Sequence, residues 1–318
     1  MSGCLLADIG GTKARFAVLR DSRLGAVETL ATRDYANAID AIRDFLGRHS
    51  EHGIDSAVIA GAGPVQDGRC ALTNASWVLD SGELAKALGL RTAKVVNDLV
   101  ALAWAAPEFV ASDVITIGRG QAAASEPIVL IAPGTGLGMA CFVPDGAQAM
   151  ASEGGHATLA STTDDEAAAV KFLHRRYGHV SAERVLSGGG LVNLYDALAD
   201  HQGAQPPSLA PEEIVRTAID GQSERARRAL DMFCAFLGSV AGNAALTFAA
   251  RGGVLIAGGI APRIVDYLRK ADFRERFENK GRLRDYLARI PTRIVIRPDP
   301  AFLGLAALAN RDRAGART

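Results

Sequence analysis

The pair Asn97-Asp98 is the clearest candidate for acid–base chemistry in this chain of 318 residues. It comes after the apolar run 93–96 and before the helical pattern 99–106, which places the Asp98 carboxylate at the end of a strand. A carboxylate there can accept the proton of a substrate hydroxyl while the hydroxyl oxygen attacks a phosphorus atom. The same position suits a helix cap, and spacing alone favours the cap at least equally.

Two further acids and a histidine could bind hydroxyl groups. Glu153-Gly154-Gly155-His156 carries a carboxylate and an imidazole on one short loop, which suits hydrogen bonds to neighbouring hydroxyls of a sugar. A surface loop and half of a metal site are the alternatives, and the lack of an H-E-x-x-H motif or a cysteine cluster counts against the metal. Glu183 lies in the first turn of a helix predicted over 182–186 with Ser181 as N-cap, where an acid ordinarily complements the helix dipole.

Three glycine-rich turns each follow an apolar run. Such a turn presents bare backbone N–H groups to a phosphate, and the acid of the first turn, Asp8, can hold a hydrated cation. One turn alone could be an ordinary hairpin, but its recurrence favours a nucleotide site. Neither the Walker spacing G-x-x-x-x-G-K-[ST] nor the dinucleotide spacing G-x-G-x-x-G occurs. The turns are Asp8-Ile9-Gly10-Gly11-Thr12, Gly134-Thr135-Gly136-Leu137-Gly138 and Gly258-Gly259.

The elements that must position these residues alternate between strand-like and helix-like patterns. This alternation predicts a mostly parallel α/β fold with ligands at the carboxyl ends of the strands. Pro107 and the turn after it mark a domain boundary, and the polar tail 310–318 is predicted to fray. Helices are predicted over 36–47, 99–106, 167–177, 182–186, 191–198, 211–219 and 226–250, with a loop over 201–211.

Composition limits the class of protein. A chain of this length usually forms two domains, and 48% hydrophobic residues can build a sizeable core. Lys+Arg and Asp+Glu both number 35, so the net charge of zero offers no footprint for nucleic acid or an anionic membrane. The four cysteines stand singly, and no run of about 18 apolar residues occurs. We therefore expect a soluble cytoplasmic protein that binds neither nucleic acid nor membrane.

These motifs resemble those of bacterial glucokinases of the proteobacterial type, within the actin, heat-shock ATPase and hexokinase superfamily. Their order and spacing agree from residue 5 to about residue 305, so the resemblance covers nearly the whole chain. The motifs that carry it are Ala7-Asp8-Ile9-Gly10-Gly11-Thr12, Leu72-Thr73-Asn74 with Trp77, Asn97-Asp98, Gly134-Thr135-Gly136-Leu137-Gly138, Ser152-Glu153-Gly154-Gly155-His156, the run from His179 to Gly188, and Ile256-Ala257-Gly258-Gly259-Ile260-Ala261-Pro262-Arg263.

The resemblance implies an α/β fold of two actin-like (ribonuclease H-like) domains with an interdomain cleft. The small domain would comprise residues 1–107 with a C-terminal helix at about 301–318, and the large domain would comprise residues 108–300. The implied activity is ATP-dependent phosphorylation of D-glucose to D-glucose 6-phosphate. Homodimers are common in the family, so a homodimer is expected.

The resemblance also implies a role for each motif. Asp98 would be the general base for the sugar 6-hydroxyl, and Asp8 would face Mg²⁺ through water. The residues that would bind the sugar are Asn97, Asp98, Glu153, His156 and Glu183. The residues that would bind ATP are Asp8, Gly10, Gly11, Thr12, Gly134, Thr135, Gly136, Gly258 and Gly259.

One residue departs from the family pattern, because Lys13 stands where the family usually has Asn. The related repressor, open-reading-frame and kinase family also carries E-x-G-H loops, but its cysteine-rich zinc motif and an N-terminal helix-turn-helix extension are absent, which argues against a sugar-sensing repressor. The alternatives are a kinase for another hexose or an N-acetyl amino sugar, and an actin-like ATPase or sugar sensor without kinase activity.

Overall fold

The computed structural model describes residues 3–49, 53–201, 203–204 and 208–315. The chain divides into two compact units. Unit 1 is Met1–Phe109 with Arg297–Thr318, and unit 2 is Val110–Ile296. The C-terminal helix α11 (Ala301–Gly315) therefore belongs to unit 1, although all of unit 2 precedes it in the sequence.

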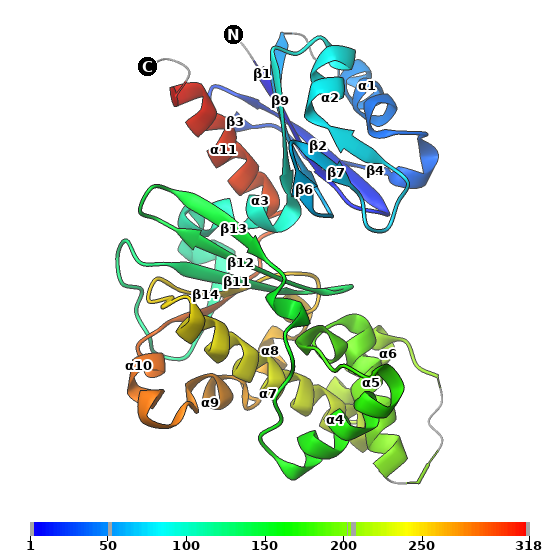
Figure 1. Ribbon diagram of the computed structural model, residues 1–318, viewed down its shortest axis with the longest axis vertical. Helices are drawn as coiled ribbons and strands as arrows, with labels where there is room; N and C mark the ends of the chain where they lie inside the picture. Colours follow the sequence, from blue (N-terminus) through cyan, green and yellow to red (C-terminus); the bar gives the residue numbers. More distant parts are fainter. Residues whose placement is uncertain (1–2, 50–52, 202, 205–207, 316–318) are drawn as a thin grey trace. The chain divides into compact units, whose positions relative to one another are not determined.

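A six-stranded sheet forms the centre of unit 1 (Figure 1). β1 and β2 form an antiparallel hairpin around the first glycine turn, as predicted, and both β3 and β4 pair with β2. On the other side of β1, β5 and β9 run parallel to it. The strands are β1 (Gly3–Ile9), β2 (Lys13–Arg20), β3 (Arg23–Leu24), β4 (Glu28–Ala31), β5 (Ile54–Gly61) and β9 (Thr92–Asn97).

The register of this sheet aligns the carboxyl ends of its three parallel strands. Ile9 pairs with Gly61, and Gly61 pairs with Asn97. Asp8 in β1 precedes this row by one residue, and Asp98 follows the row directly after β9. β5 separates β1 from β9, so at about 4.8 Å between neighbouring strands these two strands lie roughly 10 Å apart. The sheet thus brings two acids that are distant in sequence to one edge.

Helices cover both faces of the unit 1 sheet, with α3 and α11 on one side and α1 and α2 on the other (Figure 1). Side chains cap three of them: Asn37 accepts from the N–H of Asp40 in α1, Asp80 accepts from the first turn of α2, and Asn97 accepts from the first turn of α3. A small antiparallel sheet completes the unit. The remaining elements are α1 (Ala38–Arg48), α2 (Ser81–Leu88), α3 (Asp98–Trp104), β6 (Val65–Gln66), β7 (Arg69–Ala71), β8 (Val78–Asp80), and the 3₁₀ turns η1 (Thr32–Asp34) and η2 (Ala106–Glu108).

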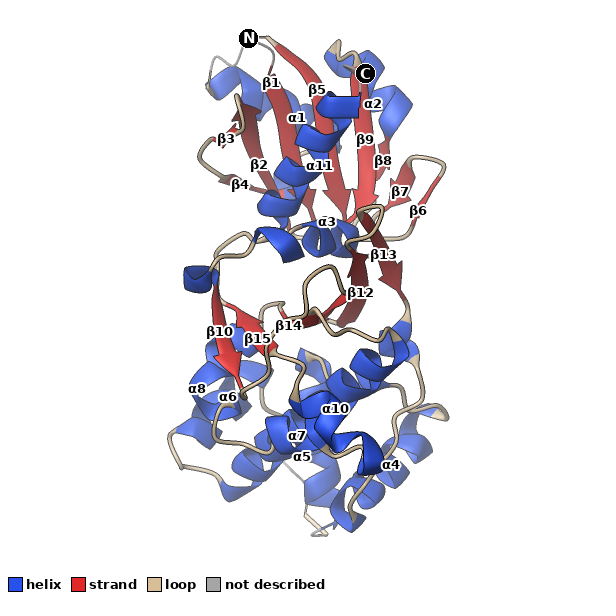
Figure 2. Ribbon diagram, turned by 90° about the vertical axis from the view of Figure 1, so that its left-hand side faces the viewer, coloured by secondary structure: helices blue, strands red, loops and turns tan. Residues whose placement is uncertain are grey.

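Unit 2 repeats the strand order of unit 1, with an antiparallel hairpin, a third antiparallel strand and two parallel strands (Figure 2). β11 and β12 enclose the second glycine turn, and β14 and β15 run parallel to β11. β10 adds an antiparallel edge. The strands are β10 (Val114–Ile117), β11 (Ile128–Pro133), β12 (Leu137–Val143), β13 (Gln148–Ser152), β14 (Gly253–Ile256) and β15 (Thr292–Val295).

The long helix α7 (Glu224–Thr247) is the centre of the unit 2 core. Its Phe233 and Phe236 are fully buried, and it packs against α5, α6 and α9. Among the described residues it is the one helix long and apolar enough to cross a membrane, but 83% of its apolar window is buried in the protein, as in a core helix. The other elements are α4 (Asp164–Tyr177), α5 (Gly188–His201), α6 (Pro211–Ile219), α8 (Val265–Leu268), α9 (Phe273–Glu278), α10 (Arg284–Ala288), and the 3₁₀ turns η3 (Ala111–Asp113), η4 (Gly154–His156), η5 (Ala182–Arg184), η6 (Ala261–Ile264) and η7 (Gly281–Leu283).

Two sequence predictions about helices are wrong. The predicted helix 182–186 is a single 3₁₀ turn, η5, and the side chain of Ser181 makes no capping hydrogen bond. The tail predicted to fray from Asn310 is helical through Gly315, because α11 packs on α3, β1 and β5 along the sheet. Residues 316–318 of that tail, and residues 202 and 205–207 of the predicted loop 201–211, lie outside the described residues.

Candidate functional site

Asn97 and Asp98 lie where β9 ends and α3 begins. The Asn97 side-chain oxygen accepts the Leu99 N–H at 2.9 Å, so the N-cap of α3 is Asn97. The Asn97 amide also donates to the carbonyl of Gly63 at 2.9 Å, which fixes its orientation. Asp98 is the first residue of the helix, and its Oδ1 shares the Leu99 N–H at 3.0 Å. Capping is therefore mainly the work of Asn97.

The Asp98 carboxyl is unusually basic for an aspartate. Burial in the end of the sheet, followed by the charge of Asp8 nearby, raises its pKa from 3.8 to about 6. The Leu99 N–H opposes this rise only in part. At neutral pH the group is mostly ionised, yet it binds a proton more strongly than an exposed aspartate does. This is the property that a general base requires.

Asp8 faces an arginine that the sequence analysis did not single out. Arg15 Nη1 lies 3.0 Å from Asp8 Oδ2, and Arg15 Nε lies 3.2 Å from Asp299 Oδ1. Burial raises the pKa of the Asp8 carboxyl, and the charge of Arg15 works against that rise. The hairpin register could have revealed the pair, because Asp8 and Arg15 are directly opposite each other on β1 and β2.

The first glycine turn is held by its neighbours. The Gly10 N–H donates to the Lys13 carbonyl at 2.9 Å, and the Thr32 hydroxyl donates to the Gly10 carbonyl at 3.2 Å. At Gly11 an added Cβ would lie 2.6 Å from the Asn74 carbonyl oxygen, so packing against that loop already requires glycine there. Thr12 is exposed beside them, and so is Lys13, the residue that departs from the family pattern.

In unit 2 the fold brings Glu153, His156 and Glu183 together. Glu153 Oε2 lies 3.8 Å from His156 Nε2, and His156 Nδ1 lies 3.9 Å from Glu183 Oε1. Glu153 and His156 are largely exposed, whereas the side chain of Glu183 is only 32% exposed. Two carboxylates and one imidazole thus form a row of hydrogen-bonding groups that can reach the adjacent hydroxyls of one sugar.

Backbone contacts hold Glu153, His156 and Glu183 beside one another. The Ala182 N–H donates to the Ala157 carbonyl at 3.0 Å, and Thr158 forms a bridge with Ser181, so η5 is held beside the loop that carries His156. Gly155 is tightly packed, because an added Cβ would lie 2.1 Å from the Leu137 carbonyl oxygen. Gly155, the second glycine of the E-x-x-H loop, is therefore needed for close packing on β12.

Glu183 does more than complement a helix dipole, which is what the sequence indicated when taken alone. Its Oε2 accepts the Leu137 N–H at 2.9 Å, across 46 residues of sequence. The acceptor loop and the second glycine turn are consequently in direct contact inside unit 2. A Cβ added at Gly136 would lie 2.5 Å from the same oxygen, which accounts for glycine at that position.

The second and third glycine turns lie at one edge of the unit 2 sheet. The Ala257 N–H donates to the Ile131 carbonyl at 2.8 Å, which aligns the ends of β14 and β11. Gly258 has a φ of +77°, and an added Cβ would lie 2.4 Å from the Pro133 carbonyl oxygen. Both its backbone conformation and its packing therefore require glycine.

A cavity of about 620 Å³ opens beside these turns. That volume is in the range of small-ligand pockets, about 300–1,000 Å³. Gly134, Thr135 and Gly259 line it, which brings three of the predicted ATP-binding residues together. The other lining residues come from α5, α6 and the segment around η6, and they are Gly188, Gly189, Leu191, Pro211, Glu212, Val215, Ile260, Arg263 and Ile264.

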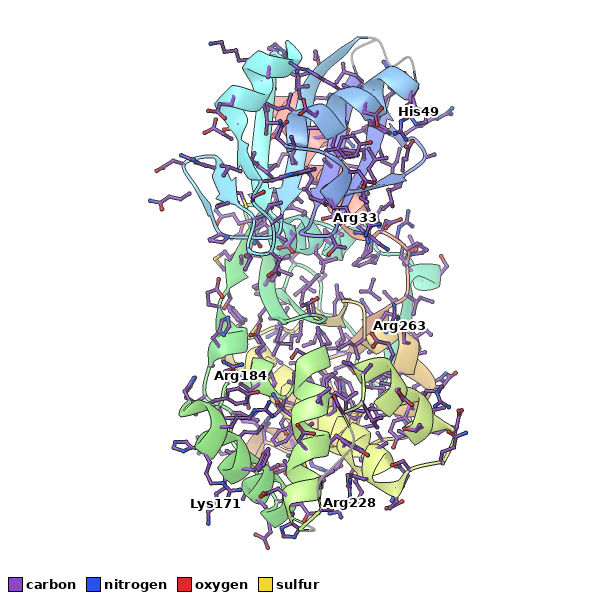
Figure 3. All side chains as sticks on the ribbon, turned by 90° about the vertical axis from the view of Figure 1, so that its right-hand side faces the viewer. Arg33, His49, Lys171, Arg184, Arg228 and Arg263 are labelled. Atoms are coloured by element: carbon purple, nitrogen blue, oxygen red, sulfur yellow. The ribbon has the colours of Figure 1, made fainter. Side chains whose placement is uncertain are left out.

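The cavity contains residues that the sequence analysis did not assign. A Cβ added at Gly134, Gly189 or Gly259 would meet no atom of the described residues within 4 Å, its chain neighbours aside, so packing alone does not explain glycine at these three places. Arg263 extends from η6 (Figure 3), is exposed, and has no side-chain partner among the described residues. Gly188 and Arg263 belong to motifs of the family resemblance, and this membership could have identified them as candidate site residues. Glu212 belongs to none of these motifs, so nothing in the sequence indicated its position in the cavity.

No group of three or more His, Cys, Asp or Glu side chains suited to a metal ion is present among the residues that the structure describes. Mg²⁺, however, is usually held by one or two carboxylates together with substrate phosphates. Asp8, at the edge of the unit 1 sheet, fits that pattern.

Comparisons with known proteins agree with this geometry. Residues 5–312 match the family model described as "Glucokinase". A glucokinase of Paramagnetospirillum magneticum is 42% identical over 311 residues, covering 96% of this chain and 97% of the relative. A crystal structure of glucokinase from an Antarctic psychrotroph has a TM-score of 0.90 and 34% identity, covering 98% of this chain and 99% of that one.

A more distant structure shares the fold alone. It is a ROK family glucokinase from Streptomyces griseus in complex with glucose and AMPPNP, with a TM-score of 0.65, 20% identity, and coverage of 98% of this chain and 100% of that one. These likenesses confirm the expected α/β fold of actin-like type.

Proposed function

The chain belongs to the glucokinase family, and on that basis we propose that it transfers the γ-phosphoryl group of ATP to the 6-hydroxyl of D-glucose. The feature of the molecule that best supports this activity is the contact of the Glu153, His156 and Glu183 row with the glycine turn 134–138. Acceptor-binding and phosphate-binding chemistry are then neighbours within one unit. A kinase for another sugar would use the same machinery with a different acceptor, but family membership does not favour it.

We propose that Asp98 is the general base. Its carboxylate takes the proton of the 6-hydroxyl as that oxygen forms a bond to the γ-phosphorus. The bond from the γ-phosphorus to the β,γ-bridging oxygen breaks, and ADP leaves with that electron pair. Positioning and removal of one proton are the protein's main contributions. The pKa of about 6 keeps the base ionised at neutral pH.

The other sugar hydroxyls would bind Glu153, His156 and Glu183, with Asn97 adding the free part of its amide. One N–H and one lone pair of Asn97 are already used by Gly63 and Leu99. We assign the phosphates of ATP to the turns Gly10–Thr12 and Gly134–Gly136, and the adenosine to the cavity beside Gly258–Gly259. Mg²⁺, with Asp8 facing it through water, would neutralise charge on the phosphate oxygens.

Gly189→Ala tests the nucleotide cavity. The protein has room for the methyl group, since nothing lies within 4 Å of it, but a nucleotide in the cavity would meet it. We expect KM for ATP to rise about tenfold while KM for glucose stays within about twofold. Gly47→Ala is the matched control, because Gly47 is equally open and lies in α1 of unit 1. Equal KM values for ATP in the two variants would show that the nucleotide does not bind in this cavity.

Sugar specificity tests the proposed function itself. A lost or inverted hydroxyl leaves a polar group that the bound sugar would cover without a partner, at a cost of about 1–3 kcal/mol, so glucose should have the highest kcat/KM in a series measured with ATP and magnesium. The sugars are glucose, mannose, galactose, fructose, N-acetylglucosamine and N-acetylmannosamine. A coupled assay that detects ADP measures the rate for each of them. If an N-acetyl sugar led the series, the amino-sugar kinase alternative would replace the proposal.

For assembly and compartment we propose a cytoplasmic homodimer. The family resemblance supports the dimer, and light scattering of the purified protein measures it directly. All four cysteines are buried free thiols, which suits a reducing compartment.

A further inference from the structure

One side chain in unit 2 contacts both the acceptor loop and the second glycine turn. Glu183 Oε2 accepts the Leu137 N–H at 2.9 Å, and its Oε1 lies 3.9 Å from His156 Nδ1. The carboxylate therefore has one oxygen on the turn that is proposed to hold phosphate and the other beside the groups proposed to hold sugar. Among the described residues, Glu153, the other acid of the row, makes no hydrogen bond to the turn, and its side chain is 89% exposed.

The contact with the turn is close on both sides. A Cβ at Gly136 would lie 2.5 Å from Glu183 Oε2, and a Cβ at Gly155 would lie 2.1 Å from the Leu137 carbonyl oxygen. The backbone at Gly136 therefore lies directly against the Glu183 carboxylate, and the backbone at Leu137 lies directly against Gly155. The Glu183 carboxylate is thus in contact with two adjacent residues of the turn, Gly136 and Leu137.

The same segment also reaches the nucleotide cavity. The Ser187 hydroxyl donates to the Glu183 carbonyl at 2.9 Å and accepts the Gly190 N–H at 3.0 Å, which ties η5 to the start of α5. The Gly188 N–H donates to the Gly134 carbonyl at 2.9 Å, which ties the start of α5 to the turn. Glu183 is therefore joined to two walls of the cavity by hydrogen bonds.

We propose that Glu183 is a positioning residue for the nucleotide as well as a ligand of the sugar. A sugar hydroxyl bound to Oε1 restricts the carboxylate, which holds the Leu137 N–H and the turn 134–138 in the form that receives phosphate. Sugar binding and nucleotide binding then strengthen each other by the same factor, about fivefold or more. This inference rests on the proposed function, because it takes the nucleotide and sugar sites from it.

The decisive measurement is nucleotide affinity without sugar. A residue that only binds sugar cannot change it, whereas a residue that positions the turn must. We expect Glu183→Ala to weaken binding of AMPPNP with magnesium about tenfold in sugar-free calorimetry, since a charge-assisted hydrogen bond to the turn is lost. Glu183→Gln keeps an oxygen for the Leu137 N–H and should restore most of that affinity while sugar binding stays impaired.

Glu153→Ala is the matched control. It removes an acid from the same row without removing a bond to the turn, so it should weaken glucose binding and leave sugar-free AMPPNP affinity within about twofold. Gly136→Ala provides a variant of the turn itself: its methyl group should weaken sugar-free binding in the wild-type background and much less in the Glu183→Ala background. Thermal melting of each variant verifies folding.

The possible results are distinct. Equal sugar-free affinities for wild type, Glu183→Ala and Glu153→Ala would overturn the inference and leave the proposed function intact. A wild-type protein that binds AMPPNP in neither the presence nor the absence of glucose would overturn the proposed function, and the inference with it. Weakening by Glu183→Ala, with recovery in Glu183→Gln, supports the inference.

Discussion

Asp98→Ala is expected to lower kcat for glucose phosphorylation by a factor on the order of 10²–10⁴, the usual contribution of a positioned general base. The carboxylate lies at the end of β9, in a place where burial and Asp8 raise its pKa to about 6. Without it, the 6-hydroxyl has no acceptor for its proton as the new bond to phosphorus forms. Glucose affinity should change much less, because other side chains bind the remaining hydroxyls. Initial rates at saturating ATP and calorimetry with glucose measure the two effects.

The pH profile separates catalysis from structure. Below pH 6 the wild-type carboxyl is protonated and cannot accept a proton, so kcat/KM should fall about tenfold per pH unit. Asp98→Asn keeps an oxygen for the Leu99 N–H, but its residual kcat/KM should not show this fall below pH 6. Asp80→Asn is the control, because Asp80 also accepts hydrogen bonds from the first turn of a helix, α2, and belongs to no proposed site. Its kcat should stay within about twofold of wild type.

The same pKa predicts a change in stability. The folded-state pKa of Asp98 lies above the ordinary value of 3.8, so the folded state binds this proton more tightly than the unfolded chain does. Its stabilising contribution is fully present below pH 3.8 and is lost as pH rises through 6. At pH 8 the free energy of unfolding of Asp98→Asn should therefore exceed that of wild type by about 3 kcal/mol, and at pH 4 the two proteins should differ little. Urea unfolding at the two pH values measures this difference.

A kcat within about threefold of wild type for Asp98→Ala would leave Asp98 with a structural role only.

Gly304→Ala is expected to destabilise unit 1 by about 3 kcal/mol or more. Gly304 lies where α11 crosses α3, and an added Cβ would lie 1.8 Å from the Ala101 carbonyl oxygen and 2.7 Å from the Ala105 nitrogen. Backbone atoms on α3 cannot move aside as a flexible side chain can, so the two helices must separate. Because Asp98 is the first residue of α3, activity should be lost with stability.

Urea unfolding followed by circular dichroism measures this effect. Gly47→Ala is again the control, since it places a methyl group in open space at an exposed position of α1 and should raise stability by about 0.5–1 kcal/mol. A Gly304→Ala protein within about 0.5 kcal/mol of wild type would show that the two helices can separate at little cost.

Helices and glycine turns were the part of the fold that could be predicted best from the sequence. The helix Pro211–Ile219 has the predicted bounds, and the glycine turns at Gly10 and Gly134 join antiparallel strands as expected. Apolar periodicity, glycine and proline act over a few residues, so a short stretch of sequence contains the whole signal. Ser181 is the counterexample. Its residue type is typical of an N-cap, but its side chain caps no helix, because the backbone after it is hydrogen-bonded to the loop at Ala157.

The chemistry of the candidate residues was likewise contained in the sequence, since an Asp after a strand and an E-x-x-H loop are local patterns. Only the tertiary structure decided their partners. Strand register places the Arg15 guanidinium beside Asp8. Contacts between segments distant in sequence give Glu183 its bond from the Leu137 N–H and give the cavity its wall from α5. The rise in the Asp98 pKa has the same origin, because burial and the charge of Asp8 act through space and exist only once β1, β5 and β9 lie side by side.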